Sequence, residues 1–148
     1  MSIVEKYMKY AARLKIGLDC HGILDKFPSD FELLTKFWSQ SGHEIHILTG
    51  KEADFVRVEL DNLKIHYDHI FSIVDHNLAI GTKMWKDDAK GKGWWMGQDD
   101  WDKSKGEYAR KVGLDLHIDN ELRYAPWFPK SCTFMFVQDG PLFLPYYW

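Results

Sequence analysis

The chain has 148 residues, of which 45% are hydrophobic and 16% aromatic, and its formal net charge is −3. This length predicts a single domain, residues 1–148, and the composition excludes a disordered chain. The mildly acidic balance excludes a nucleic-acid backbone as the expected main partner. The lack of any run of about 20 apolar residues excludes a predicted membrane span.

Strand and helix patterns alternate along the chain. In chain order, the predicted elements are a helix over residues 2–13, a strand at 16–19, a helix of about ten residues from 28, a strand at 44–50, a helix at 52–63, a strand at 69–74, a helix that contains 108–112, and strands at 114–119 and 133–138. This alternation predicts a Rossmann-like, three-layer α/β/α fold around a mostly parallel sheet of about five strands.

The two cysteines, Cys20 and Cys132, lie far apart and form no short-spaced pair of the kind that binds zinc or acts as a redox couple. We therefore expect both to be reduced thiols. The first residues lack the long apolar core of a signal peptide, which favours a soluble, cytoplasmic protein.

The stretch from Asp75 to Asp102 interrupts the alternation and is rich in glycine, lysine and tryptophan. A structureless loop of this length is unusual in a compact domain, so we predict a β-hairpin that turns near residues 89–93 and forms a small lid. Its tryptophans are expected to pack onto the body, and stacking on a nucleobase is the alternative. The aromatic tail at 141–148 is also expected to pack on the body, with a homodimer contact as the second choice.

Reactive side chains stand at the ends of three predicted strands. Asp19 ends the first, a Thr-Gly pair at 49–50 ends the second, and an Asp-Asn pair at 119–120 ends the fourth. A lysine, Lys105 or Lys103, precedes or opens the helix before the fourth strand. Because the carboxyl ends of parallel strands meet at one rim of a sheet, folding would bring these groups together.

This set of side chains suits phosphoryl transfer. A carboxylate such as Asp19 can attack phosphorus and hold the phosphoryl group as an acyl phosphate. A hard cation such as Mg²⁺, held by carboxylate oxygens, would neutralise the charges of nucleophile and substrate. A hydroxyl and backbone N–H groups can hold phosphate oxygens, and a lysine compensates the charge that develops in the transition state.

The same segments resemble the haloacid dehalogenase-like hydrolase superfamily, whose members are mostly magnesium-dependent phosphatases. LDCHGIL looks like its first motif, HILTG like the second, and SKGEYARKVGLDLHIDN like the third and fourth together. The match in order and spacing runs from about Lys15 to Gln138, and the short linker at 22–44 leaves no room for a large cap. The chain is thus similar to short phosphatase- or nucleotidase-like members, including those found in phages. The resemblance implies a strand order of 5-4-1-2-3.

The resemblance implies three catalytic residues. Asp19 would be the nucleophile, and Lys105 would pair with it and with the phosphate. His21 would protonate the leaving oxygen and then activate water. It stands where phosphatases of the family usually have a second aspartate, but imidazole is also a competent acid and base near neutral pH.

The resemblance also implies binding roles. Thr49, Gly50 and Lys51 would hold a small phosphorylated substrate, such as a nucleotide. The implied Mg²⁺ ligands, which supply carboxylate, carboxamide and backbone oxygens, are Asp19, Asp119, Asn120 and the carbonyl of His21. Asn120 stands where a second acid is common, so it contributes no charge.

Several of these residues have another interpretation. Asp19 can cap a turn, and the Thr49 hydroxyl can be satisfied at a strand end. Lys103 and Lys51 compete with Lys105 for the active-site role. Cys20 with His21 offers a thiolate nucleophile, which we disfavour because adjacent residues on an extended segment point to opposite sides. Three histidines could in principle bind zinc, although no predicted helix places them together: His66, His69 and His76.

We therefore predict a Mg²⁺-dependent phosphomonoester hydrolase. The main alternative is a catalytically weak or inactive relative that binds a phosphorylated ligand or a protein partner, and His21 and Asn120 are the residues that favour it. A third hypothesis is a dehalogenase or another carbon-centred transferase. We disfavour it because the lysine and acid motifs for phosphate and metal are present.

Overall fold

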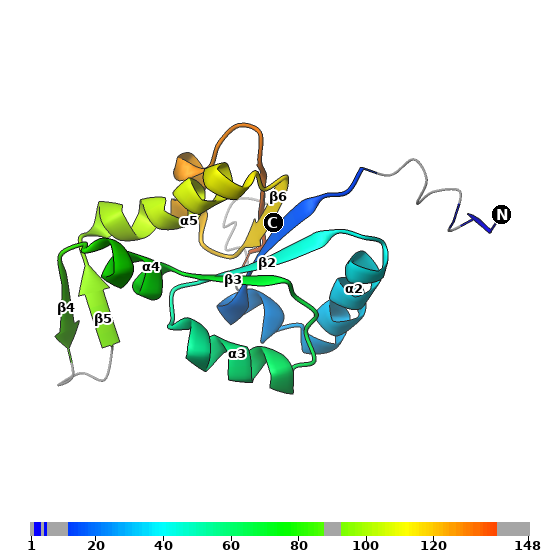
Figure 1. Cartoon of the computed structure of the whole chain (residues 1–148), viewed down its shortest axis with the longest axis horizontal. Helices are drawn as coiled ribbons and strands as arrows, with labels where there is room; N and C mark the ends of the chain where they lie inside the picture. Colours follow the sequence, from blue (N-terminus) through cyan, green and yellow to red (C-terminus); the bar gives the residue numbers. More distant parts are fainter. Residues whose placement is uncertain (1, 4, 6–11, 88–92, 139–148) are drawn as a thin grey trace, which may run out of the picture.

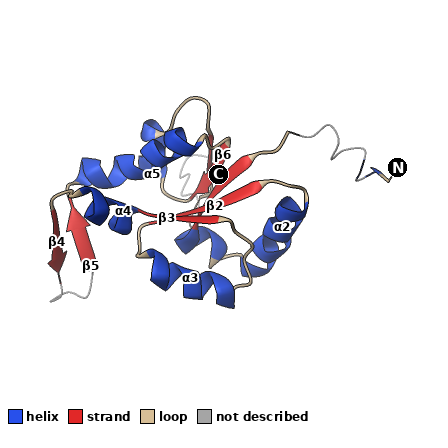
Figure 2. Cartoon of the chain, in the orientation of Figure 1, coloured by secondary structure: helices blue, strands red, loops and turns tan. Residues whose placement is uncertain are grey.

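The computed structural model describes residues 2–3, 5, 12–87 and 93–138 (Figures 1 and 2). The helix predicted at 2–13 lies largely outside these residues, and the aromatic tail at 141–148 lies entirely outside them. Across the described part of the chain, no helix combines the length and the apolar character needed to cross a membrane.

Five parallel strands form the central sheet (Figure 1). They are β1 (Lys15–Asp19), β2 (Glu44–Thr49), β3 (His69–Ser72), β6 (Leu116–Asp119) and β7 (Thr133–Phe136). Their order is β3-β2-β1-β6-β7, so the first strand lies in the middle. The predicted α/β class, parallel sheet and strand order are confirmed. The third strand ends two residues earlier than predicted, because a helix begins at Ile73.

Side chains that alternate along the strands build two apolar cores, one on each face of the sheet. On β2, Ile45 and Ile47 belong to one core and Leu48 to the other. Helices α2 (Pro28–Gln40) and α3 (Ala53–Asn62) cover the first face, and α5 (Gln98–Val112) covers the second (Figure 1). The result is the predicted three-layer α/β/α arrangement.

Short turns follow the strands at the edge where the polar residues gather. A kinked helical turn, η1 (Cys20–Leu24), follows β1, and a 3-10 helix, η3 (Leu122–Trp127), follows β6. Gly22 in η1 has φ of 92°, a conformation that glycine adopts without the strain of a Cβ. The chain can therefore turn away immediately after Asp19 and leave its carboxylate at the rim.

The predicted insertion at 75–102 contains more regular structure than expected. Helix α4 (Ile73–Ile80) covers its start, and α5 covers its end from Gln98. Between them, β4 (Met84–Asp87) and β5 (Gly93–Met96) form the predicted antiparallel hairpin. Its connecting residues, 88–92, lie outside the description.

Two expectations for this region are wrong. Helix α4 replaces the end of a predicted strand because the run IFSIV, apolar apart from Ser72, shows no period that separates helix from strand. The Ser72 hydroxyl accepts the backbone N–H of Asp75 at 3.1 Å and caps the helix. The prediction that the tryptophans pack onto the body holds for Trp101, which packs against the second core, and is wrong for Trp85 and Trp95, which are exposed on the hairpin.

Candidate active site

Three predicted site residues end three neighbouring strands. Asp19, Thr49 and Asp119 are the last residues of β1, β2 and β6. The parallel register pairs Leu18 with Ile118, so the two aspartates follow at adjacent positions of adjacent strands. The structure thus brings these strand ends to one edge of the sheet, as the motif spacing predicts.

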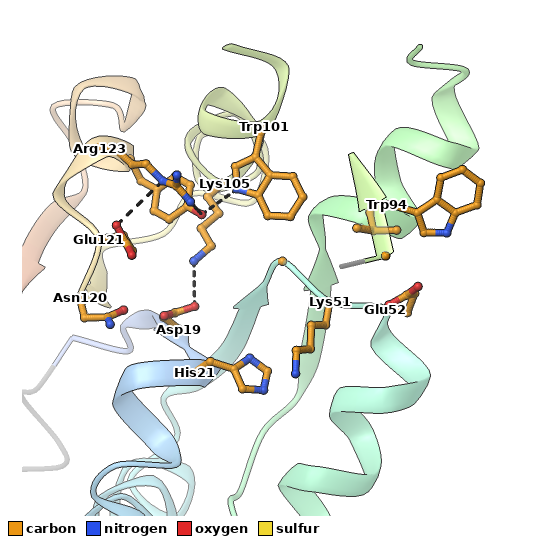
Figure 3. A pocket seen from close by; sticks show the side chains of 14 residues that line it. Asp19, His21, Lys51, Glu52, Trp94, Trp101, Lys105, Asn120, Glu121 and Arg123 are labelled. Carbon is orange, nitrogen blue, oxygen red and sulfur yellow. Dashed lines mark hydrogen bonds and ion pairs between the residues drawn. The ribbon is translucent and has the colours of Figure 1, made fainter. Parts of the chain in front are cut away.

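The side chain of Lys105 joins the two aspartates. Its Nζ lies 2.9 Å from Oδ1 of Asp19 (Figure 3) and 2.8 Å from Oδ2 of Asp119. Lys105 is 2% exposed. The competing Lys103 instead pairs with Asp100 at 3.3 Å on the helix surface. Residues two apart on a helix point about 200° apart, so only one of the two lysines can face the sheet edge.

Burial and mutual contact set the ionisation of this trio. Burial raises the pKa of Asp19 to about 6; the Asp119 charge adds to this rise and Lys105 opposes it. Burial also opposes the charged form of Asp119, but its contacts with His117 and Lys105 outweigh it and lower its pKa. Burial opposes the charge on Lys105 too, yet the two aspartates raise its pKa above the ordinary value. At neutral pH, two carboxylates therefore face one ammonium.

Asp119 is held by a residue that the sequence analysis missed. His117 is fully buried, and its Nε2 lies 2.9 Å from Oδ2 of Asp119. Its ring stacks on Phe128 with centroids 4.8 Å apart. The backbone N–H of Glu121 donates to the other oxygen, Oδ1, at 2.9 Å. The sequence pattern that could have predicted this contact is the two-residue spacing, which puts His117 and Asp119 on the same face of β6.

A close contact between α5 and η3 positions Lys105. A Cβ placed on Gly106 would lie 2.3 Å from the carbonyl oxygen of Trp127, so only glycine lets the two helices approach this closely. Tyr124 of η3 lies with its ring 4.4 Å from Nζ of Lys105. The lysine therefore depends on a backbone contact as well as on its ion pairs.

The predicted phosphate-binding loop follows β2. Gly50 and Lys51 line the same cleft as Asp19, whereas Thr49 is fully buried. The Thr49 hydroxyl accepts the backbone N–H of Lys51 at 3.2 Å, so it shapes the loop. A Cβ on Gly50 would come within 2.7 Å of the Trp101 indole, so this position needs the bare backbone.

His21 lies in the cleft but is held by a partner that the sequence analysis did not anticipate. Its Nε2 lies 2.6 Å from Oε2 of Glu59 on α3, and each side chain is 33% exposed. In Figure 3 the ring extends toward Lys51 and not toward Asp19. Glu59 is 38 residues away in sequence, so no local pattern pointed to it.

Asn120 closes the cleft floor against the turn after β1. A Cβ on Gly22 would come within 2.1 Å of its Nδ2, so the turn and the carboxamide can lie together only because residue 22 is glycine. Asn120 lines the cleft together with Asp19 and His21. The predicted ligand oxygens thus come from one small region, with the Asp119 carboxylate buried beside it.

The thiolate interpretation of Cys20 does not fit this environment. The residue is fully buried, and burial raises its pKa to about 12, with the charges of Glu59 and Asp19 adding to the rise. A thiol with such a pKa is protonated at neutral pH and is a poor nucleophile.

The cleft above the aspartates has a volume of about 310 Å³. Its upper wall is aromatic and basic: Trp94 comes from the hairpin, Trp101 from α5 and Arg123 from η3 (Figure 3). Tyr124 of η3 also lines the cleft. Trp101 Nε1 donates to the Tyr124 hydroxyl at 2.9 Å, which ties the two rings together. Of these four residues, only the tryptophans were singled out from the sequence.

The donor set fits a hard divalent cation. Asp19 and Asp119 offer carboxylate oxygens, Asn120 offers a carboxamide oxygen, and the two acids outweigh the single Lys105 ammonium in charge. Mg²⁺ prefers such oxygen ligands and retains water on its remaining positions, which an open cleft allows.

Comparisons of the chain with protein-family models, with curated proteins and with solved structures found no match.

Proposed function

We propose that the chain is a Mg²⁺-dependent phosphomonoester hydrolase that forms an aspartyl phosphate on Asp19, as do the haloacid dehalogenase-like phosphatases that its motifs resemble. One observation carries the proposal: Nζ of Lys105 bridges Asp19 and Asp119 at 2.9 and 2.8 Å beneath an open cleft. A buried ion cluster adds little to stability compared with apolar packing of the same volume. Its placement at a ligand-binding edge of the sheet therefore favours a chemical role.

In the first step, a carboxylate oxygen of Asp19 attacks phosphorus, and the bond from phosphorus to the leaving oxygen breaks. His21 gives that oxygen a proton. Because Nε2 faces Glu59, the transferred proton is the one on Nδ1, and the contact with Glu59 holds the ring in place. Lys105 offsets the negative charge that builds on Asp19 and the phosphoryl oxygens.

In the second step, the now neutral Nδ1 of His21 takes a proton from water while the water oxygen attacks phosphorus. The bond between phosphorus and the Asp19 oxygen breaks, which releases inorganic phosphate and restores the carboxylate. Mg²⁺, when bound, would supply positive charge to the phosphate and the nucleophile. The residues that would hold it are Asp19, Asp119, Asn120 and, through its backbone carbonyl, His21.

The cleft suits a small phosphorylated substrate. Lys51 and Arg123 supply positive charge on two sides, and Trp94 and Trp101 supply apolar aromatic surface above the aspartates. A leaving group with a flat ring, such as a nucleoside, matches this wall.

The test is phosphate release from p-nitrophenyl phosphate and a panel of nucleotides, with Mg²⁺ and with chelator. Wild-type activity should require Mg²⁺, and Asp19→Asn should lower it to background while the far-UV circular dichroism stays unchanged. Asp30→Asn, an exposed acid in the first turn of α2, is the matched control and should keep full activity. Wild-type activity no higher than that of Asp19→Asn with any metal would contradict the proposal.

The inactive, ligand-binding alternative is favoured by one observation, the hydrogen bond that holds Nε2 of His21 on Glu59. His21→Asp separates the two readings. A strong gain in turnover would mark histidine as an attenuating residue, and a loss would mark it as the working acid and base. Titration calorimetry with inorganic phosphate would show ligand binding without turnover.

A further inference from the structure

A second cluster of ligating side chains lies at the opposite edge of the sheet. Glu44 is the first residue of β2 and His69 the first of β3, whereas the candidate active site lies at the other ends of the strands. Along β2, Glu44 and Thr49 are five residues apart, roughly 16 Å at the rise of a strand. The proposed phosphatase chemistry makes no use of this cluster.

Sheet geometry places the three residues of the cluster on one face. Glu44 and His46 are two apart on β2, so their side chains point to the same side. His69 is the register partner of His46 on β3, which puts its side chain beside that of His46. The two imidazole rings lie 4.6 Å apart between centroids, tilted by 33°.

The potential ligand atoms converge on a common point. Oε1 of Glu44 lies 2.7 Å from Nε2 of His46 and 3.3 Å from Nε2 of His69, and all three atoms lie within 4.8 Å of one another. Tetrahedral zinc with bonds of about 2.1 Å separates its ligand atoms by about 3.4 Å. The Glu44–His69 distance already meets this value, and the Glu44–His46 distance needs to open by less than an ångström.

A hydrogen bond from α5 also holds the ring of His46. His46 is 2% exposed, and its Nδ1 lies 2.7 Å from the hydroxyl of Tyr108 on α5. A hydrogen bond on the second ring nitrogen is the usual support of a metal-binding histidine, because it fixes the ring and its tautomer. Tyr108 is itself stacked on Phe71 at 4.4 Å, so its hydroxyl is well positioned.

The outer side of the cluster is open. The side chains of His69 and Glu44 are 53% and 39% exposed, so an ion can enter and a water molecule can complete its coordination. A cation, Lys15, is the register partner of Glu44 on β1. Its ammonium donates to the carbonyl of Val112 at 2.8 Å, which ties it to the end of α5.

From this geometry we propose that Glu44, His46 and His69 form a binding site for a divalent transition-metal ion of the zinc class. Two imidazoles and one carboxylate select such an ion over Mg²⁺, which prefers an all-oxygen set. The bound ion would link β2 to β3 at the edge remote from the cleft. The site is independent of phosphatase activity.

The test uses untagged protein freed of metal with a chelator, then titrated with ZnCl₂ by calorimetry and with CoCl₂ by visible absorption. We expect one tight equivalent, a tetrahedral Co²⁺ spectrum and a higher Tm with zinc. His69→Ala and Glu44→Gln should weaken this binding at least tenfold, because each removes one of the three ligands. Both residues are partly exposed, so the substitutions should leave the fold intact.

Two controls separate this site from others. His66→Ala removes an exposed histidine three residues before His69 and should bind zinc as the wild type does. Asp19→Asn removes the main acid of the cleft and should also keep the equivalent. The proposal is overturned if wild type binds no zinc at micromolar concentrations, if His69→Ala binds it as tightly as wild type, or if Asp19→Asn abolishes the binding.

Discussion

The floor of the cleft and its rim are built in different ways. On the floor, Asp19, Lys105 and Asp119 are almost completely buried and hold one another through hydrogen bonds and ion pairs. On the rim, His21 and Glu59 are one-third exposed and depend mainly on a single mutual contact. Removal of Lys105 from the floor would leave two buried carboxylates without their cation, whereas a rim group can be exchanged at small energetic cost.

This contrast bears on one of the two positions at which the chain departs from the phosphatase pattern that its motifs resemble. Asn120 lies at the floor of the cleft, whereas His21 lies on the rim. A rim residue can vary in identity because solvent screens its charge and neighbouring side chains can adjust. A substitution of residue 21 is therefore expected to leave the fold intact.

The largest expected effect is on the floor. Lys105→Met removes the ammonium and leaves two buried carboxylates facing each other, which should lower the free energy of unfolding by about 3–5 kcal/mol. Urea denaturation followed by tryptophan fluorescence measures this. Lys103→Met, on the surface two residues away, is the matched control and should change stability by less than about 0.5 kcal/mol. Equal effects from both lysines would show that the buried ion pairs of Lys105 contribute no more to stability than the contacts of a surface lysine.

An intermediate effect is expected behind the floor, where α5 meets η3. Gly106→Ala places a Cβ 2.3 Å from the Trp127 carbonyl, so the helix must shift and carry Lys105 with it. We expect a loss of about 1–3 kcal/mol, as for other overpacked sites. Gly97→Ala meets only a carboxylate oxygen of Asp100 at 3.3 Å and should be tolerated. Thermal unfolding of both variants measures the difference, and a stable Gly106→Ala protein would contradict the backbone contact.

The smallest effect on stability is expected at the rim. Glu59→Gln removes the charge that faces His21 but keeps the size of the side chain, so stability should fall by less than about 1 kcal/mol, as for exposed ion pairs. If the proposed function holds, turnover should fall more than substrate affinity, because only the proton-transfer role of His21 is disturbed. A variant with unchanged kcat would separate Glu59 from that role.

The site residues that end strands could be predicted from the sequence, whereas their partners from distant segments could not. Asp19, Thr49 and Asp119 could be placed from sequence because each directly ends an apolar strand run, and parallel strands bring such ends to one edge. Lys105 could be preferred over Lys103 from its distance to Asp119. Partners contributed from distant parts of the chain were missed, among them Glu59 on α3 and Arg123 on η3.

The histidines show the limit most clearly. A zinc interpretation from sequence grouped His66, His69 and His76, which are near in the chain. The structure instead brings His69 beside His46 and Glu44, through the register of two strands separated by a helix. Proximity in sequence could not reveal this, because neighbours across a sheet are fixed by strand order and register.

The sequence by itself determined the alternation of strands and helices, and therefore which residues end at the carboxyl edge of the sheet. Hydrophobic periodicity and strand ends are local properties of the sequence, so they do not depend on which tertiary contacts form. Tertiary structure alone decided which side chain each polar residue contacts. Three features depend on how remote segments pack together. They are the pairing of His21 with Glu59, the contact of α5 with η3, and the cluster of Glu44, His46 and His69.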